Sequence, residues 1–210
     1  MSDFLSDRTA WQESMNGVTI DCSLDIAVHP AETDTILLTI PGVDGSVNGY
    51  EDKYIRMVEA FQQKRGAAGV RIANPFITSH HWESNPRQGL EYIHRHLEEI
   101  TGRTSSVEIA VVAHSAGAAI IARIAHEYPD ITRLLLINPA KKLLSSGDMP
   151  RALGPLVRNT TVVFGGEDPS VDMADELREG GIDVQIIDGA DHNFSGEYLV
   201  RFIGLAAEFL

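Results

Sequence analysis

The stretch of sequence that decides the fold is Val107–Ala119, which reads VEIAVVAHSAGAA. Residues 107–112 are apolar and rich in β-branched side chains, which is typical of a strand buried on both faces. Residues 116–126 have few polar side chains and a helical pattern, so we expect that helix to pack against a sheet. Between them, a tight turn centred on Ser115 leads from the strand directly into the helix.

This turn has consequences for the serine at its centre. A turn so tight forces Ser115 into strained backbone geometry and brings the residues two before and two after it nearly into contact. Both positions must therefore be small, and they are Ala113 and Gly117. The serine hydroxyl is held clear of the chain at the amino end of a helix, where free N–H groups and a partial positive charge favour anionic chemistry.

The segment Ala113-His114-Ser115-Ala116-Gly117 resembles the nucleophile elbow of the α/β-hydrolase superfamily, in the variant with alanine at the first small position. The preceding strand and the following helix are the context that this motif requires. The alternative is an ordinary strand–loop–helix junction in which the serine caps the helix. The resemblance implies a serine nucleophile, with an acid and then a histidine further along the chain.

Length and composition limit the classes of protein that fit. The 210 residues are enough for one α/β domain spanning 1–210 and leave little room for a second. The net charge of −13 argues against nucleic acid or an anionic membrane surface as a partner. No apolar run approaches the length of a membrane span.

Further observations concern the compartment and the first residues. The single cysteine, Cys22, excludes an intrachain disulfide and is expected to be a small core residue. The beginning of the sequence has neither a basic start nor an apolar core, so we predict no signal peptide and a cytoplasmic location. Residues 1–17 are polar and mixed, and we interpret them as an arm or a short helix.

The rest of the chain alternates strand and helix patterns. Strands are expected at 18–28 (a half-buried edge strand), 35–40, 70–73, 107–112, 133–137, 160–164 and 183–187, with helices at 50–65, 90–100, 116–126, 171–177 and 198–209. This alternation predicts a mostly parallel sheet of about seven strands with helices on both faces. In larger members of the superfamily a cap follows the strand 133–137, and here only Lys141–Asn159 intervenes, so we expect no cap domain.

The acid and the histidine have candidates in the required order. His192 follows the last predicted strand, where the superfamily places its histidine, and Asp168 follows the strand 160–164, where it places the acid. The acid would orient the imidazole, which would act as the base for Ser115. Glu167 is the adjacent alternative to Asp168, whereas Asp191 is too close to His192 in sequence to reach its ring easily.

The resemblance also implies an oxyanion hole made of backbone N–H groups. One donor is the N–H of Ala116, directly after the serine. The other comes from the loop after the third strand, here residues 42–49, where the N–H of Val43 is the first candidate and that of Asp44 the second. Many members have His-Gly at this strand end, and this chain has Pro41-Gly42.

A second loop, residues 76–86, is expected near the same edge of the sheet. Residues interpreted as lining the pocket are His114, Asp44, His80, His81 and Trp82. The alternative is a metal site built from His80, His81 and Glu83. Side chains that are adjacent in an extended loop point apart, however, and no second cluster completes such a site, so no metal is predicted.

These features together predict a serine hydrolase that cleaves a small-molecule acyl ester or thioester and needs no cofactor. A thioesterase or an acyltransferase would use the same residues, since pocket shape selects the leaving group and the acceptor. An alternative of another class is a non-catalytic binding protein on a hydrolase scaffold. The sequence leaves the oligomeric state open.

Overall fold

The computed structural model describes residues 4–78 and 81–210, and within these residues eight strands form one sheet. Their spatial order is β1-β2-β4-β3-β5-β6-β7-β8. β2 pairs antiparallel with both β1 and β4, and all later pairings are parallel. The strands are β1 (Leu5–Met15), β2 (Val18–His29), β3 (Thr35–Ile40), β4 (Ala68–Ile72), β5 (Glu108–His114), β6 (Ile131–Ile137), β7 (Thr160–Gly165) and β8 (Asp183–Ile187).

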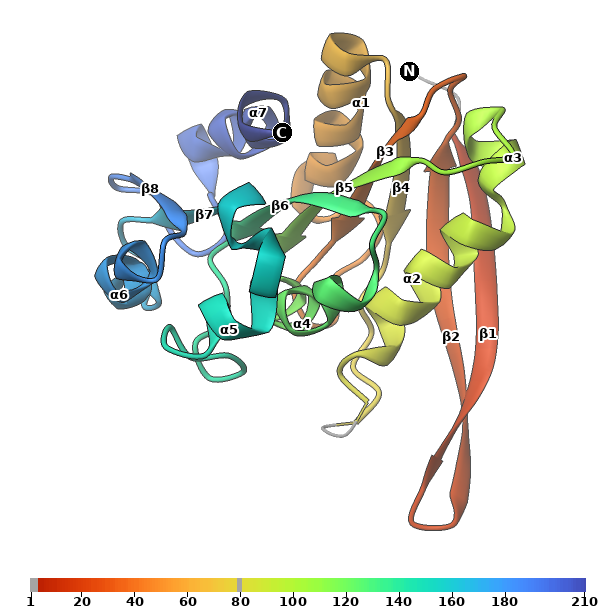
Figure 1. Cartoon of the computed structure of the whole chain (residues 1–210), viewed down its shortest axis with the longest axis horizontal. Coiled ribbons are helices and arrows are strands. Elements are labelled where there is room, and N and C mark those ends of the chain that lie inside the picture. The colour runs from red at the N-terminus through yellow and green to blue at the C-terminus, as the bar shows by residue number, and fades with distance from the viewer. Residues whose placement is uncertain (1–3, 79–80) are drawn as a thin grey trace.

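Helices cover both faces of the sheet, as predicted (Figure 1). α1 (Lys53–Arg65) and α7 (Leu199–Phe209) pack together on one face, where Phe61 and Phe202 belong to one buried apolar cluster. A second cluster lies on the other face. The helices of that face are α2 (Ser84–Arg95), α3 (Leu97–Thr101), α4 (Ala116–Ile124), α5 (Met149–Leu153) and α6 (Ala174–Glu179).

For two of the expected helices whose bounds differ in the structure, the backbone shows the local cause. The helix expected from residue 50 begins at Lys53, because Glu51 and Asp52 adopt the left-handed conformation with φ of 50° and 55°. Tyr50–Asp52 forms only a short 3₁₀ turn. The helix expected over 90–100 is divided into α2 and α3 at His96, whose φ of −112° leaves helical geometry.

The interpretation of residues 1–17 as an arm or a short helix is wrong for Leu5–Met15, which forms β1. β1 pairs with β2 along its whole length, so β2 is the second strand of the sheet and not its edge. The far end of this hairpin projects from the rest of the molecule (Figure 1). The extra strand raises the count from the predicted seven to eight within the described residues.

The segment 141–159 forms no cap domain, as expected. It contains α5 and a 3₁₀ helix, Gly154–Asn159. α5 packs against α4, on the face of the sheet, and so adds to the helical layer. In the part of the chain that the structure describes, the carboxyl edge of the sheet is therefore bordered by loops and carries no separate folded cap.

The close approach of α4 to the end of β3 requires a residue without a side chain at Gly117, and this requirement can be tested. A Cβ at this position would lie 2.3 Å from the Pro41 carbonyl oxygen and 2.9 Å from that of Ile40. We expect Gly117→Ala to lower the free energy of unfolding by about 1–3 kcal/mol, because backbone must move to admit the methyl group. The matched control is Gly204→Ala in α7, where a Cβ meets no atom within 4 Å.

Urea denaturation of both variants measures this difference. Gly204→Ala should be neutral or stabilising by up to about 1 kcal/mol, because alanine favours helix more than glycine does. If Gly117→Ala proved as stable as Gly204→Ala, the close packing at the start of α4 would be contradicted.

Candidate active site

Ser115 lies between β5 and α4 in the strained geometry expected of the turn. Its φ is 55° and its ψ is −120°, a combination that side-chain-bearing residues rarely adopt. Two backbone hydrogen bonds fix the turn against β6 and the loop after it. The N–H of Ser115 donates to the Ile137 carbonyl at 2.9 Å, and the N–H of Ala140 donates to the Ser115 carbonyl at 3.1 Å.

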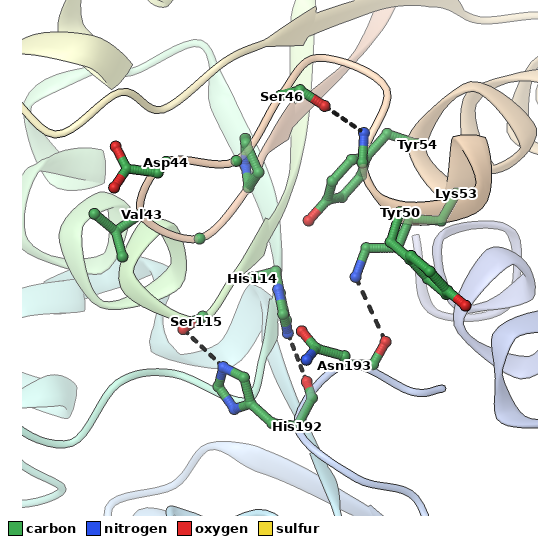
Figure 2. A pocket seen from close by; sticks show the side chains of 14 residues that line it. Val43, Asp44, Ser46, Tyr50, Lys53, Tyr54, His114, Ser115, His192 and Asn193 are labelled. Carbon is green, nitrogen blue, oxygen red and sulfur yellow. Dashed lines mark hydrogen bonds between the residues drawn. The ribbon is translucent and has the colours of Figure 1, made fainter. Parts of the chain in front are cut away.

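His192 lies in the loop after β8, and its ring reaches the serine. The distance from His192 Nε2 to Ser115 Oγ is 2.9 Å. The backbone of His192 is also held, because its carbonyl accepts hydrogen bonds from His114 Nε2 at 2.8 Å and from Asn138 Nδ2 at 2.9 Å. The imidazole is thus presented to the serine by a loop that β5 and the end of β6 hold in place (Figure 2).

Asp168 holds the other side of the histidine ring. It follows β7, is only 1% exposed, and accepts a short hydrogen bond from His192 Nδ1 through Oδ2. Its Oδ1 accepts from the N–H of Ser170 at 2.6 Å. Burial raises the pKa of this carboxyl, but the hydrogen bonds from His192 and Ser170 outweigh burial, so the pKa is lowered overall.

This arrangement determines which ring nitrogen of neutral His192 carries the proton. An ionised carboxylate only accepts hydrogen bonds, so the Nδ1 that faces Asp168 must be the protonated nitrogen. Nε2 is then free to accept a hydrogen bond from the Ser115 hydroxyl. The three side chains form one hydrogen-bonded series in which a base faces the serine.

The two alternative acids do not contact the ring in the described structure. Asp191 caps its own loop, because its Oδ1 accepts from the N–H groups of Asn193 at 3.0 Å and Ser195 at 2.8 Å. These bonds lower the pKa of Asp191, the largest effect being that of Ser195. Glu167 is exposed. Asp168 is therefore the carboxylate that the fold brings to His192.

The loop after β3 approaches the serine from the other side. A Cβ on Gly42 would lie 3.5 Å from Ser115 Oγ, so the chain passes next to the hydroxyl. Asp44 uses its N–H to bond the Asn74 carbonyl at 2.8 Å, and its Oδ1 accepts from the N–H of Phe76 at 2.9 Å. The N–H of Asp44, the second candidate for the oxyanion hole, is thus already occupied.

The two first candidates for the oxyanion hole keep their N–H groups available. Within residues 4–78 and 81–210, the N–H of Val43 makes no backbone hydrogen bond. Ala116 is the first residue of α4, and N–H groups in a first helical turn have no partner within the helix. Val43 and Ser115 line the same cavity.

That cavity has a volume of about 450 Å³. It lies between the loop after β3, the start of α1 and the His192 loop (Figure 2). Its lining residues include Pro41, Gly42, Val43, Asp44, Tyr50, Lys53, Tyr54, His114, Ser115, His192 and Asn193. His114 and Asp44 are among these lining residues.

Two residues of the loop 76–86 that were expected to line the pocket lie next to the main cavity. His81 and Trp82 line a separate small hollow, which shares Val43 with that cavity. His81 is held by Thr78 Oγ1 at 2.7 Å and lies 3.4 Å from a Glu13 oxygen. His80 lies outside the described residues.

Glu83, which was named for the metal alternative, is engaged by two arginine side chains. Glu83 makes ion pairs with Arg87 at 3.0 Å and Arg123 at 3.4 Å. Across residues 4–78 and 81–210, the structure contains no group of three histidine, cysteine, aspartate or glutamate side chains placed to hold a metal ion.

Among the cavity residues that sequence reasoning missed are Lys53 and Tyr54. Tyr54 is recognisable in the sequence only as part of the apolar face of its helix, and Lys53 only as a charged residue near its start. Their place beside a glycine-rich loop at the carboxyl edge of the sheet was the available signal. Glu51 and Asp52, whose left-handed conformation sets the direction of the first turn of α1, give no indication of this in the sequence.

The buried imidazole of His114 makes stability depend on pH. Burial, with a smaller effect of the Lys53 ammonium, lowers the pKa of His114 to about 3. An exposed imidazole titrates near pH 6.5, so the unfolded state binds more protons throughout this window. Stability is therefore full above about pH 6.5 and is lost as the pH falls toward the folded-state pKa.

We expect the wild type to lose about 2–3 kcal/mol more free energy of unfolding than His114→Gln between pH 7 and pH 4.5, at about 1.4 kcal/mol per pKa unit. Urea denaturation of both proteins at the two pH values measures the difference. His29, whose burial lowers its pKa to about 4, contributes to both proteins alike. Equal losses in the two proteins would show that His114 is not the group responsible.

Comparison with known proteins identifies the fold. No family model matches the chain, and no curated protein matches it significantly. Solved structures match over nearly the whole length. A dienelactone hydrolase from Anabaena variabilis is 22% identical, with a TM-score of 0.65, over 97% of this chain and 96% of that chain.

Two further solved structures also match this chain over nearly its whole length. An α/β serine hydrolase homologue from Coxiella burnetii is 16% identical, with a TM-score of 0.62, over 96% of this chain and 97% of its own. Carboxyl esterase 2 from the fungus Tuber melanosporum is 14% identical, with a TM-score of 0.65, over 100% of this chain and 86% of its own. At these identities the likeness shows the fold alone: the chain has the α/β-hydrolase fold.

One further structural finding concerns membranes. Of the helices in the described part of the chain, none is long and apolar enough to span a bilayer.

Proposed function

We propose that this protein is a serine hydrolase that cleaves a carboxylic ester or thioester through an acyl-enzyme on Ser115. The observation that carries the proposal is the hydrogen-bonded series from Asp168 through His192 to Ser115 Oγ, with 2.9 Å between the ring and the hydroxyl. The neighbours named as a dienelactone hydrolase and an esterase support the same class of reaction.

In the first half of the reaction, Ser115 Oγ bonds to the acyl carbon while His192 Nε2 takes the hydroxyl proton. The carbonyl oxygen becomes an oxyanion, which the N–H groups of Ala116 and Val43 would stabilise. Each such donor contributes about 3 kcal/mol to transition-state stabilisation. Collapse of the intermediate breaks the bond to the leaving oxygen or sulfur, and His192 gives its proton to that atom.

In the second half, a water molecule attacks the acyl carbon of the acyl-enzyme. His192 Nε2 takes a proton from the water and returns it to Ser115 Oγ as the acid leaves. Asp168 remains ionised and stabilises the imidazolium in both halves, as its lowered pKa favours. An acyltransferase would differ only in using another hydroxyl, thiol or amine in place of water.

The proposal is tested by labelling the wild type with a fluorophosphonate probe and locating the labelled residue by mass spectrometry. Turnover is then measured on acyl esters and thioesters of varied chain length, with and without added alcohol acceptors. We expect labelling of Ser115 and release of free acid. Folded protein that neither labels nor turns over any substrate would favour the non-catalytic binding protein, and transfer to the alcohol would favour the acyltransferase.

A further inference from the structure

Lys53 places a buried ammonium group in the cavity beside Ser115. It is the first residue of α1, only 4% exposed, and it lines the same cavity as Ser115 and His192. Figure 2 shows its Nζ directed inward from the side of the cavity opposite Val43. The reaction described above does not use this group.

The ammonium has few partners for a buried cation. Its Nζ lies 3.5 Å from the Asn193 carbonyl oxygen and 4.3 Å from the centre of the Phe202 ring. Within the described residues, no carboxylate approaches it within ion-pair distance. An ammonium has three donors, and burying it without a paired anion is costly.

The Lys53 amine stays largely protonated at neutral pH although it is buried. Burial lowers the pKa of Lys53 to about 8, and the charge of Asp191 works in the opposite direction. Asp191 already accepts two backbone hydrogen bonds from its own loop. The cavity therefore holds a largely protonated amine with donor capacity that the protein itself does not use.

The hydroxyl of Tyr54 adds a second donor next to Lys53. Tyr54 is 1% exposed, and its hydroxyl makes no hydrogen bond to any other residue that the structure describes. In Figure 2 this hydroxyl points into the cavity, toward the space above His114. Because this hydroxyl faces the cavity and has no protein partner among the described residues, it is available to a ligand that accepts hydrogen bonds.

The remaining charged group of the cavity wall does not oppose an anion there. The Asp44 side chain points away from the middle of the cavity in Figure 2, and its carboxylate accepts the N–H of Phe76. His114 is neutral because its pKa is lowered to about 3. Lys53 is thus the one charged side chain that faces the space between Tyr54 and His114 among the described residues that line the cavity.

We propose that Lys53 and Tyr54 form a subsite for a carboxylate on the substrate, so that the preferred substrate is an ester or thioester that carries a second, ionised carboxyl group. This inference rests on the proposed hydrolase function. The ammonium would pair with the carboxylate and the Tyr54 hydroxyl would donate to it. A charge-assisted hydrogen bond in such a site corresponds to a preference of roughly 10- to 100-fold.

The alternative is a purely structural lysine that positions the His192 loop through the Asn193 carbonyl. That role predicts equal losses on charged and neutral substrates when Lys53 is replaced. The carboxylate subsite predicts a selective loss on the charged substrate. The ratio of kcat/KM values for two substrates of the same shape therefore separates the two roles.

Two pairs of substrates test the subsite on either side of the ester bond. For the acyl side, 4-nitrophenyl hydrogen adipate is compared with neutral 4-nitrophenyl 6-oxoheptanoate. For the alcohol side, 4-acetoxybenzoate is compared with neutral 4-acetoxyacetophenone. We expect the wild type to prefer the charged member of one pair, which identifies the portion of the substrate that carries the carboxylate.

The variants are Lys53→Met, which keeps the stem without the charge, and Lys53→Arg, which keeps the charge. We expect Lys53→Met to reduce the charged-to-neutral ratio about 10-fold or more and Lys53→Arg to restore part of it. Lys64→Met, at the other end of α1, is the matched control and should leave the ratio unchanged. Thermal denaturation of each variant confirms that it is folded.

A binding measurement keeps the subsite separate from catalysis. Calorimetric titration of adipate and 4-acetoxybenzoate into Ser115→Ala protein, with and without Lys53→Met, should show at least one ligand bound about 10-fold more weakly without the lysine. Turnover of neutral esters without any charged preference would overturn the subsite and leave the hydrolase. A wild-type protein that neither labels nor turns over any ester would overturn the hydrolase. Binding that depends on Lys53 would then still support the subsite.

Discussion

Replacing Ser115 with alanine is expected to abolish fluorophosphonate labelling and to lower kcat by a factor on the order of 10⁶, because no other atom takes the place of its Oγ. Within the described residues, this hydroxyl is the group that donates to His192 Nε2, at 2.9 Å. The residual rate would come from the cavity and the oxyanion donors alone. Labelling, burst kinetics and steady-state turnover on one ester measure the effect.

The same substitution should leave the fold intact. The turn at Ser115 is held by backbone hydrogen bonds to Ile137 and Ala140, which alanine keeps, and the left-handed φ of 55° is unchanged. We expect the free energy of unfolding to change by less than about 1 kcal/mol, since only one side-chain hydrogen bond is lost. Retained activity in folded Ser115→Ala would contradict the proposed nucleophile.

The control for this experiment is a serine outside the cavity. Ser146 is half-buried outside the cavity, and its hydroxyl is occupied by a hydrogen bond to Glu176. Ser146→Ala should therefore label and turn over as the wild type does. Labelling that survives in Ser115→Ala and disappears in Ser146→Ala would place the reactive serine elsewhere.

The parts of the site that sequence predicts are those fixed by strand ends. Ser115, Asp168 and His192 each follow a strand of apolar residues, and parallel strands bring their carboxyl ends to one edge of a sheet. The contacts among them then depend on loops only a few residues long. For this reason the spacing along the chain indicated which side chains would meet.

Lys53 and Tyr54 could not be placed in this way. Their positions depend on the direction of the first turn of α1, which follows Glu51 and Asp52 in left-handed geometry with φ of 50° and 55°. Side chains without glycine's freedom rarely adopt that geometry, so the sequence predicts a continuing helix. The part of the cavity wall formed by Lys53 and Tyr54 therefore depends on a local departure from the helical sequence pattern.

β1 was missed for a different reason. Its covered side contains polar residues, because Asp7 accepts a hydrogen bond from Tyr92 at 2.7 Å and Glu13 accepts one from Ser84 at 2.6 Å, both from α2. Such a strand shows no apolar alternation. The turn Asn16-Gly17, with φ of 50° and 79°, was the available signal, since Asn-Gly favours a two-residue hairpin.

Replacing Asp168 with asparagine is expected to lower kcat by about 10⁴-fold while the protein stays folded. The amide would offer an N–H to His192 Nδ1 where the carboxylate now accepts one, and the proton would move to Nε2. A ring protonated at Nε2 cannot take the proton of Ser115 Oγ. Single-turnover acylation measures the step directly, because it depends on the base and not on product release.

Stability also distinguishes this carboxylate from its neighbours. The pKa of Asp168 is lowered in the folded state, so its contribution to stability is present above about pH 4 and is lost as the pH falls through the folded-state pKa. Asp168→Asn should therefore flatten the acid side of the stability curve below about pH 4. Urea denaturation between pH 2.5 and pH 5 tests this expectation.

Glu167→Gln is the matched control, because it makes the same chemical change one residue earlier on an exposed side chain. We expect it to acylate at the wild-type rate, since Glu167 makes no hydrogen bond to His192 within the described residues. If Glu167→Gln acylated slowly and Asp168→Asn acylated at the wild-type rate, the role of the buried carboxylate would be structural. The opposite result, together with a serine that no longer labels in Asp168→Asn, would mean that Asp168 sets the tautomer on which the reactivity of Ser115 depends.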